Sequence, residues 1–261
     1  MKTGISTASF FLRGETEDAI KTIKELGAGC AEVFLGTYYE YRPEFAKKHA
    51  PLAEGMDICS IHALSTNFEP QLFSASRRVR GDAYYWLDQL MRSAQLFGTD
   101  KYSFHGCVAH GHERKDIEEV AGYLNAVSDF CGRYGVTVCL ENVAWCTYNH
   151  PGLFKEFKSR CPHIVGVFDI KQARRSGYPY GLYIEDMSGA ISHVHLSDID
   201  ENGKLCLPGK GVYNFEEIFK RLKGAGFDGP ALIEVYSSDY GEVSELKNSL
   251  EYLDEIIYKL S

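Results

Sequence analysis

The chain has 261 residues, 44% of them hydrophobic, which is enough for a large buried core. Its formal net charge is −8, from 28 basic and 36 acidic residues, and this balance argues against a nucleic-acid-binding surface, where lysine and arginine gather. No run reaches the roughly 18 uncharged apolar residues of a membrane span, and the N-terminal segment lacks the apolar core and cleavage site of a signal peptide. We therefore expect a cytoplasmic protein that binds neither a membrane nor a nucleic acid.

Strand-like and helix-like segments alternate along the whole chain. Short runs rich in valine, isoleucine, cysteine and phenylalanine predict strands at 3–7, 30–35, 58–64, 101–106, 136–142, 164–170, 191–198 and 231–236. Apolar periodicity predicts helices between them or after the last one, at 15–26, 43–53, 79–97, 115–134 and 243–260. Strands buried on both faces and separated by helices pair in parallel.

The number of strand–helix units bears on the fold. Eight units favour closure into a barrel over an open doubly wound sheet. The first strand is not followed by a G-x-G-x-x-G motif, which counts against a dinucleotide-binding sheet. No proline-, serine- or glycine-rich linker divides the chain. The sequence therefore predicts an α/β protein with one domain over residues 1–261, built as a single (β/α)8 TIM barrel.

Six of the expected strands have, near their C-terminal ends, a side chain that can bind a divalent metal. In chain order these are His62, His105, Glu141, Asp169, His195 and Glu234. In parallel barrels the strand C-termini gather at one mouth, where active sites lie. Taken singly, each carboxylate is more often a helix cap or a salt-bridge partner. Carboxylates that converge inside a barrel mouth would repel one another without a cation, so the pattern as a whole predicts a metal site.

Glu141, Asp169, His195 and Glu234 form the strongest subset. Their spacings of 28, 26 and 39 residues each match about one strand–helix unit, so successive strands supply them. Three carboxylates and one imidazole suit a hard divalent ion, and zinc also accepts this set. We expect one divalent metal, of Mn²⁺, Co²⁺, Mg²⁺ or Zn²⁺, with Mn²⁺ or Zn²⁺ favoured, and no organic cofactor.

The sequence around these four residues resembles the xylose-isomerase-like TIM barrels, a superfamily with sugar-phosphate isomerases and epimerases, ketose 3-epimerases and endonuclease IV. The resemblance runs through all 261 residues. Its most specific pieces are LEN around Glu141, GVFDIKQARRSGY around Asp169, HVHLSD around His195, LPGKGVYNF at 207–215 and LIEVY around Glu234. In that superfamily the four matching positions bind one catalytic divalent metal. The resemblance implies that the two glutamates form the proton-transfer pair of a sugar or sugar-phosphate isomerase or epimerase.

The chemistry of such a site agrees with this expectation. A metal that holds a ketone oxygen and a neighbouring hydroxyl acidifies the C–H bond between them and stabilises the enediolate that follows. One glutamate can remove the proton and the other can return one on the opposite face, which inverts the carbon. A single shared base gives aldose–ketose isomerisation instead. The sequence leaves these outcomes open, together with a dehydratase or lyase acting on an inosose-like ring.

His62 and His105 have three interpretations. In sugar-acting members such histidines can contact substrate hydroxyls, and this is the role that we expect. In endonuclease-IV-like members they bind a second zinc, and a structural role is the third alternative. Gln172 stands where a third zinc needs histidine, and the 198–214 loop contains no histidine. An apurinic-site endonuclease is therefore disfavoured.

The remaining residues near the motifs are less specific. Gln172 also replaces a substrate-binding histidine of the epimerases, but it keeps a hydrogen-bonding group. Lys171 and Lys210 are candidates for binding a phosphate or carboxylate of the substrate, with a solvated surface lysine as the alternative for each. Glu32 could face the pocket or pair with a lysine, and a structural role is favoured for it. Asp198 is assigned either a capping role or support of the site.

The expected partner is a small carbohydrate, and a sugar-binding barrel without catalysis is the alternative from a different class. Barrels of this superfamily often pair through their helical faces. Tyrosine-rich segments are candidates for the contact in a homodimer or higher homo-oligomer, and their tyrosines are Tyr38, Tyr39, Tyr41, Tyr178, Tyr180 and Tyr183.

Overall fold

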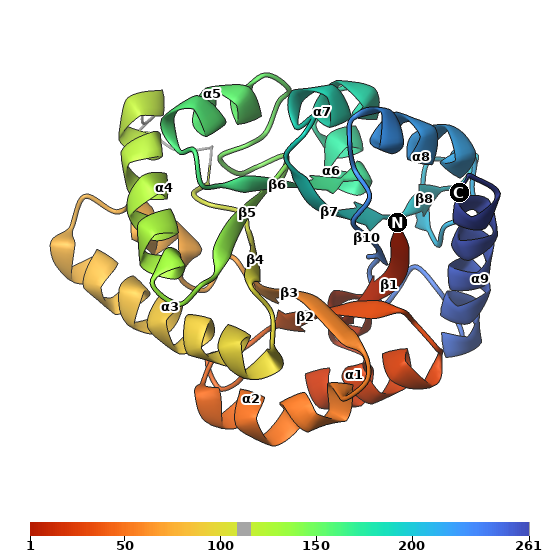
Figure 1. The fold of residues 1–261 in the computed structure, drawn as a ribbon, viewed down its shortest axis with the longest axis horizontal. Coiled ribbons are helices and arrows are strands. Elements are labelled where there is room, and N and C mark those ends of the chain that lie inside the picture. Colours follow the sequence, from red (N-terminus) through yellow and green to blue (C-terminus); the bar gives the residue numbers. More distant parts are fainter. Residues whose placement is uncertain (109–115, 261) are drawn as a thin grey trace.

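The computed structural model describes residues 1–108 and 116–260. Parallel strands close into a barrel with helices around its outside (Figure 1). The barrel strands are β1 (Lys2–Ser6), β2 (Cys30–Leu35), β3 (Asp57–Ala63), β4 (Lys101–Phe104), β5 (Thr137–Glu141), β6 (Val165–Asp169), β7 (Ile191–Leu196) and β10 (Pro230–Ile233). Their order around the barrel is β1-β10-β7-β6-β5-β4-β3-β2, and β2 pairs back with β1. The predicted (β/α)8 barrel is confirmed.

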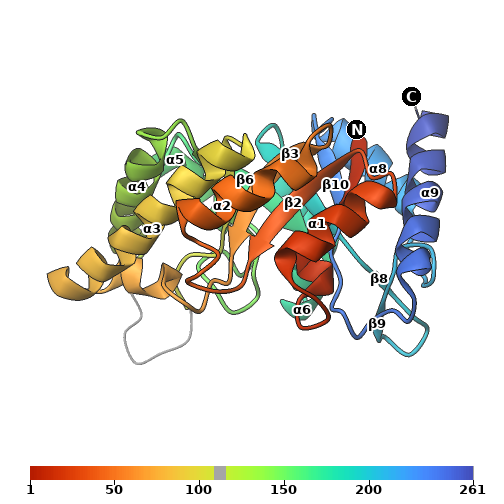
Figure 2. The same ribbon diagram turned by 90° about the horizontal axis from the view of Figure 1, so that it is seen from below.

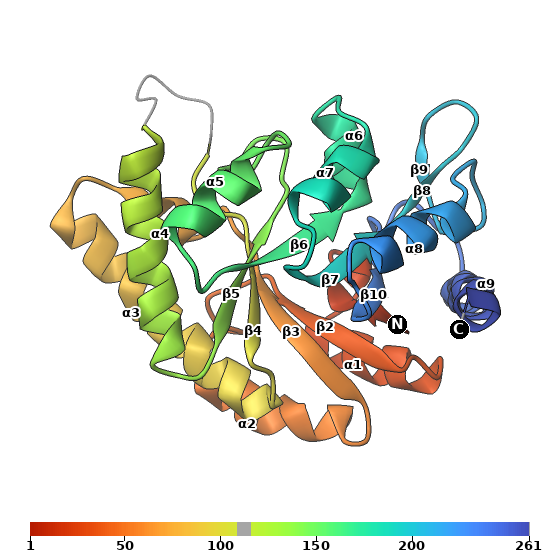
Figure 3. The same ribbon diagram turned by 45° about the horizontal axis from the view of Figure 1, so that its top comes forward.

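Helices cover the outer surface, with α3 and α4 on one side and α8 and α9 on the other (Figure 3). The described α-helices are α1 (Thr16–Glu25), α2 (Pro43–His49), α3 (Arg77–Phe97), α4 (Ile117–Gly132), α5 (Leu153–Arg160), α6 (Ile170–Arg175), α7 (Tyr180–Asp186), α8 (Phe215–Gly224) and α9 (Val243–Leu260). Short 3₁₀ helices are η1 (Thr7–Phe10), η2 (Ala50–Ala53) and η3 (Glu69–Phe73). Among these described helices, none is long and apolar enough to cross a membrane.

Local sequence explains where the longer helices lie. In α3 the buried residues Leu87, Leu90, Ala94 and Phe97 recur every three or four positions, so one stripe of the helix packs on the barrel. Gly98 ends this helix in the left-handed conformation at φ 77°, where glycine has no steric penalty.

The bounds of α9 agree with the helix predicted at 243–260. The helix predicted at 115–134 corresponds to α4, although Lys115 lies outside the described residues.

Two short features between β6 and β10 were not predicted. The segment between β6 and β7 forms α6 and α7, and the loop after β7 contains a hairpin of β8 (Asp198–Ile199) and β9 (Leu205–Cys206). Helices of one or two turns and two-residue strands are too short to give a periodic sequence pattern. The hairpin and α6 lie on the side of the barrel opposite the two chain termini (Figure 2).

Asp198 organises the loop that follows β7. Its buried carboxylate accepts hydrogen bonds from the backbone N–H groups of Ile199, Gly209, Gly211 and Tyr213, at 2.8, 3.2, 3.1 and 3.0 Å. A Cβ at Gly211 would lie 2.1 Å from the Ile199 carbonyl oxygen, so a side chain cannot fit there. Asp198 therefore supports the loop at the mouth, and it does not cap a helix.

The tyrosines predicted to form a contact between copies are not equivalent in the structure. Tyr41 and Tyr183 are fully buried and cannot contact a second copy, so this part of the prediction is wrong. Both are held inside the fold, where the Tyr183 hydroxyl donates to the Asn149 carbonyl at 3.0 Å. Tyr38, Tyr39 and Tyr178 are exposed, and pairing through them stays a prediction.

The close approach of β1 to β2 gives a test of the barrel. A Cβ at Gly4 would lie 2.3 Å from the Cys30 carbonyl oxygen, whereas a Cβ at Gly122, exposed on α4, would have no neighbour within 4 Å. We predict that Gly4→Ala lowers the free energy of unfolding by about 1–3 kcal/mol or more, because the strands must move apart. The control Gly122→Ala should raise it by up to about 1 kcal/mol. Urea unfolding measures both, and equal stabilities would contradict the packing described.

Candidate active site

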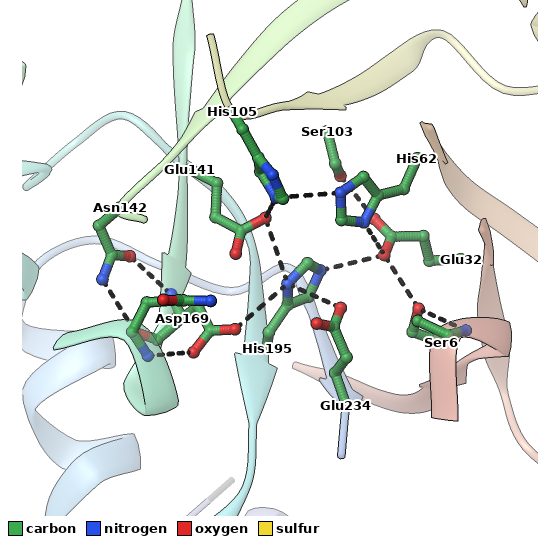
Figure 4. Close-up of polar contacts among 12 residues, drawn as sticks. Ser6, Glu32, His62, Ser103, His105, Glu141, Asn142, Asp169, His195 and Glu234 are labelled. Atoms are coloured by element: carbon green, nitrogen blue, oxygen red, sulfur yellow. Dashed lines mark hydrogen bonds and ion pairs between the residues drawn. The ribbon is translucent and has the colours of Figure 1, made fainter. Parts of the chain in front are cut away.

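Four predicted metal ligands meet at the mouth of the barrel, and His195 lies at their centre (Figure 4). The other three are Glu141 at the end of β5, Asp169 at the end of β6 and Glu234 just after β10. Nδ1 of His195 lies 3.0 Å from Glu234 Oε2, 3.7 Å from Glu141 Oε2 and 3.9 Å from Asp169 Oδ2. These four residues are called the four-residue cluster below.

The four-residue cluster is buried and incompletely satisfied. The residue Glu234 is 8% exposed, and each of the other three residues is 1% exposed. Within this cluster, four buried atoms have no hydrogen-bond partner among the described residues, namely Asp169 Oδ2, His195 Nδ1, His195 Nε2 and Glu234 Oε2. Ligand atoms of Glu141, Asp169 and His195 lie within 4.8 Å of one another. Buried polar atoms without partners are costly, and this oxygen-rich donor set fits a divalent cation.

Neighbouring groups fix the orientation of Asp169. Its Oδ1 accepts a hydrogen bond from the backbone N–H of Gln172 at 2.8 Å and so caps α6. The side chain of Asn142 bridges the Asp169 backbone, donating to its carbonyl at 2.8 Å and accepting from its N–H at 2.7 Å. One carboxylate oxygen of Asp169 is thereby occupied, and the other faces the cluster.

Lys171 is a cation inside the site and not a surface lysine. Its side chain is buried, and Nζ donates to Glu234 Oε1 at 3.0 Å and lies 3.3 Å from Asp169 Oδ2. The ring centroid of Tyr236 is 5.3 Å from the same Nζ. The ammonium predicted to bind a substrate anion is thus already paired with two carboxylates. Lys210, the second predicted anion-binding lysine, is exposed on the loop that Asp198 supports.

His62 and His105 meet each other and Glu141. The Nε2 atoms of the two histidines are 3.0 Å apart, and His105 Nε2 lies 3.0 Å from Glu141 Oε2. Ligand atoms of these three residues also lie within 4.8 Å of one another. The ring of Trp145 packs edge-on against His105, with centroids 6.2 Å apart. The side chain of Gln172 is buried nearby, and its Oε1 accepts from the Ala144 N–H at 3.5 Å.

A structural role was favoured for Glu32 from the sequence, with a side chain facing the pocket as an alternative, and its contact with His195 was not predicted. Its fully buried carboxylate accepts hydrogen bonds from the hydroxyls of three serines, Ser6, Ser60 and Ser103. Oε1 of Glu32 also lies 3.2 Å from Nε2 of His195. A lone glutamate within the apolar strand CAEVFL was the signal in the sequence.

The charges of nearby residues favour the ionised form of both glutamates in the cluster. Burial alone would raise the pKa of Glu141, but His105 and His195 hold it well below its ordinary range. Burial likewise opposes ionisation of Glu234, yet His195 and Lys171 lower its pKa. Both side chains are therefore carboxylates near neutral pH and can accept a proton.

Burial and the excess of negative charge also shift the pKa values of the other ionisable groups at the site. Burial raises the pKa of Asp169 to about 6. Burial would lower the pKa of His195, but the carboxylates of Glu234 and Glu32 raise it well above its ordinary range. The pKa of His62 is raised to about 9 because contact with Glu32 outweighs its burial. In the protein without metal, protons on histidines therefore supply part of the compensating positive charge, and a metal at His195 Nδ1 has to displace one.

Solved structures with the same fold include enzymes that act on sugars. D-psicose 3-epimerase from Clostridium cellulolyticum H10, solved with D-tagatose, matches with a TM-score of 0.79 and 17% identity over 98% of this chain and 99% of that chain. The IolI protein, solved with a zinc atom, has a TM-score of 0.77 and 17% identity over 99% of both chains. AsbF from Bacillus anthracis, a probable 3-DHS dehydratase involved in petrobactin synthesis, has a TM-score of 0.77 and 15% identity over 97% of this chain and 99% of that chain.

At these identities the likeness concerns the fold alone. A search of curated proteins finds no match. The family model of the xylose isomerase-like TIM barrel matches residues 20–256. The chain therefore belongs to the xylose isomerase-like TIM barrel family.

Proposed function

We propose that the protein is a divalent-metal-dependent isomerase or epimerase of a small sugar or sugar phosphate. The observation that carries this proposal is the convergence of three carboxylates on Nδ1 of His195, with buried ligand atoms left unsatisfied in the described part of the chain. The sugar epimerase and the zinc-containing IolI protein with the same fold support it.

Glu141, Asp169, His195 and Glu234 are the residues that we expect to hold the metal. A divalent cation there would polarise a ketone oxygen of the substrate and stabilise the negative charge that develops beside it. Three carboxylate ligands suit Mn²⁺, and the zinc in the IolI structure supports Zn²⁺ as the alternative.

Glu141 and Glu234 are proposed as the proton-transfer pair. They come from different strands and approach His195 from different sides (Figure 4). Because their pKa values are lowered, both are carboxylates before the reaction, so one can remove a proton from the substrate carbon. The other can return a proton to the opposite face after it has taken one up from water.

His62, His105 and Gln172 are proposed to contact substrate hydroxyls. The two histidines lie next to Glu141, and the Trp145 ring beside His105 adds an apolar surface. Lys171 is assigned a different role from the one predicted, because its contact with Glu234 keeps that carboxylate ionised. Lys210 keeps its predicted role of binding an anionic group of the substrate.

The reaction can be tested by incubating metal-loaded protein in heavy water with ketoses, ketose phosphates and inososes. The proposal predicts deuterium at the carbon next to the carbonyl of one substrate class, with a product of otherwise unchanged mass. A product that has lost water would instead show a dehydratase, the activity ascribed to AsbF. Cleavage of an abasic oligonucleotide that chelation abolishes, without exchange on any sugar, would contradict the proposal.

The proton-transfer pair can be tested with Glu141→Gln and Glu234→Gln. Each change keeps the shape of the side chain but removes the proton acceptor, so deuterium exchange should fall about 10²- to 10⁴-fold at saturating metal. Asp186→Asn is a matched control, because Asp186 is also a buried carboxylate bound by backbone N–H groups and lies outside the cluster. Unchanged exchange in both glutamine variants would remove the acid–base assignment.

Lys171→Met distinguishes the two roles of the buried lysine. Without the ammonium the pKa of Glu234 rises, so the acidic limb of the kcat–pH profile should move to higher pH while KM changes little. Lys210→Met is the comparison, and it should raise KM for a phosphorylated substrate without moving the profile. A raised KM and an unmoved profile for Lys171→Met would show that Lys171 binds the substrate anion, as first predicted from the sequence.

Metal removal should make stability depend on pH. The pKa of His62 is about 9 in the fold, above its ordinary value of 6.5, so the stabilisation from its proton is complete below pH 6.5 and is lost as pH rises through 9. In the presence of a chelator the free energy of unfolding should fall over this range by an amount on the order of 1–3 kcal/mol.

The variant His62→Gln should make this dependence shallower in urea unfolding, and the remaining dependence would come from the proton on His195. His163→Gln, at an exposed histidine, is the control and should keep the wild-type slope. A wild-type stability that stays constant from pH 6.5 to 9 would show that the proton on His62 does not compensate the buried carboxylates.

A further inference from the structure

Glu32 lies in the middle of β2 and joins side chains from four other strands. Three hydroxyls donate to its carboxylate, from Ser6 on β1 at 3.1 Å, Ser60 on β3 at 2.7 Å and Ser103 next to the end of β4 at 2.5 Å. The fourth strand is β7, which supplies His195. Because the side chain is 0% exposed and held from several directions, its carboxylate has a fixed position.

The ring of His195 lies between Glu32 and the mouth. Its Nε2 is 3.2 Å from Glu32 Oε1, whereas its Nδ1 faces Glu234 at 3.0 Å and the other carboxylates of the cluster. A neutral imidazole has one N–H group and one lone pair. Without metal, carboxylates lie beside both nitrogens, so both can carry a proton. A cation among the carboxylates at the mouth would take the lone pair of Nδ1, and the carboxylate of Glu32 would then favour the remaining proton on Nε2.

His62 has a similar arrangement around the same oxygen. Its Nδ1 lies 3.4 Å from Glu32 Oε1, and its Nε2 faces His105. The rings of His62 and His195 are nearly parallel, with centroids 6.1 Å apart and an interplanar angle of 20°. One carboxylate oxygen therefore lies behind both histidines, and each ring presents its other nitrogen away from Glu32.

We propose that Glu32 is a positioning residue that fixes the ring orientation and tautomer of His195, so that Nδ1 presents its lone pair to a divalent cation. This inference rests on the metal site of the proposed function but not on the identity of the substrate. Histidines that bind metals usually donate their second N–H to a carboxylate or carbonyl, and loss of that partner weakens metal binding. Ligand atoms of Glu32 also lie within 4.8 Å of those of His193 and His195, and of those of His62 and Glu234, but in the proposed arrangement its carboxylate stays at Nε2 of His195 and does not bind the cation.

A purely structural role is the alternative interpretation. The interior of a (β/α)8 barrel is normally filled by branched apolar side chains, which avoid the cost of burying a carboxylate. At the level of Glu32 this barrel instead has serines and histidines, and the register pairs Glu32 with Ser6 and Ser60. These contacts would tie strands together whether or not a metal binds, so metal affinity and stability have to be measured separately.

The test compares wild-type protein with Glu32→Gln and Asp186→Asn, without substrate. The dissociation constant for Zn²⁺ is measured by competition with a chromophoric chelator, and the stability of each metal-free variant by urea unfolding. We expect Glu32→Gln to bind Zn²⁺ about 10- to 100-fold more weakly. Asp186→Asn, which also loses a buried carboxylate, should bind with wild-type affinity. Equal affinities in wild type and Glu32→Gln would overturn the proposal, even if the variant is less stable.

A second measurement needs no variant and so does not depend on whether Glu32→Gln folds. In zinc-loaded wild-type protein, ¹⁵N nuclear magnetic resonance should show His195 protonated at Nε2 with the metal on Nδ1. Metal on Nε2, or a proton on Nδ1, would overturn the proposal. Wild-type protein that binds no Zn²⁺ would overturn both this inference and the proposed function, whereas normal binding without sugar turnover would leave this inference standing.

Discussion

The structure depends on how it compensates carboxylates that the closed barrel removes from water. Glu141, Asp169 and Glu234 are all at most 8% exposed and lie around one histidine nitrogen. Isolated buried carboxylates are strongly unfavourable, and their mutual repulsion adds to the cost. Lys171 pairs with two of them, and protonated histidines compensate further negative charge. A divalent cation would satisfy the ligand atoms that remain, which is why the arrangement favours a metal-dependent function.

His195 lies between the buried carboxylate of Glu32 and the carboxylates at the mouth of the barrel. One of its nitrogens faces Glu32, which the serines of neighbouring strands hold, and the other faces the carboxylates at the mouth. The residues beneath the site thus control which atom His195 presents to it. Lys171 brings a positive charge to the carboxylates of the site. It lies on α6, immediately after β6, and contacts Glu234, which follows β10.

The barrel and the positions of the cluster could be predicted because they follow from simple repeated features. Apolar strands alternate with helices, and Asp169 or Glu141 at a strand end must lie at the mouth once the strands are parallel. Glu32 could not be assigned in the same way, because its partners come from strands far apart in the sequence and no local pattern records them. The pairing of Lys171 was also missed, since α6, the helix that carries it, has only six residues and is too short for a periodic signature.

The most direct test of the account is to locate the metal in crystals of metal-loaded protein by anomalous diffraction at the absorption edge of manganese or zinc. The account predicts one peak among Glu141, Asp169, His195 and Glu234. No peak, or a peak only between His62 and His105, would contradict it, because the carboxylates proposed to transfer protons would then lack the cation that their arrangement requires.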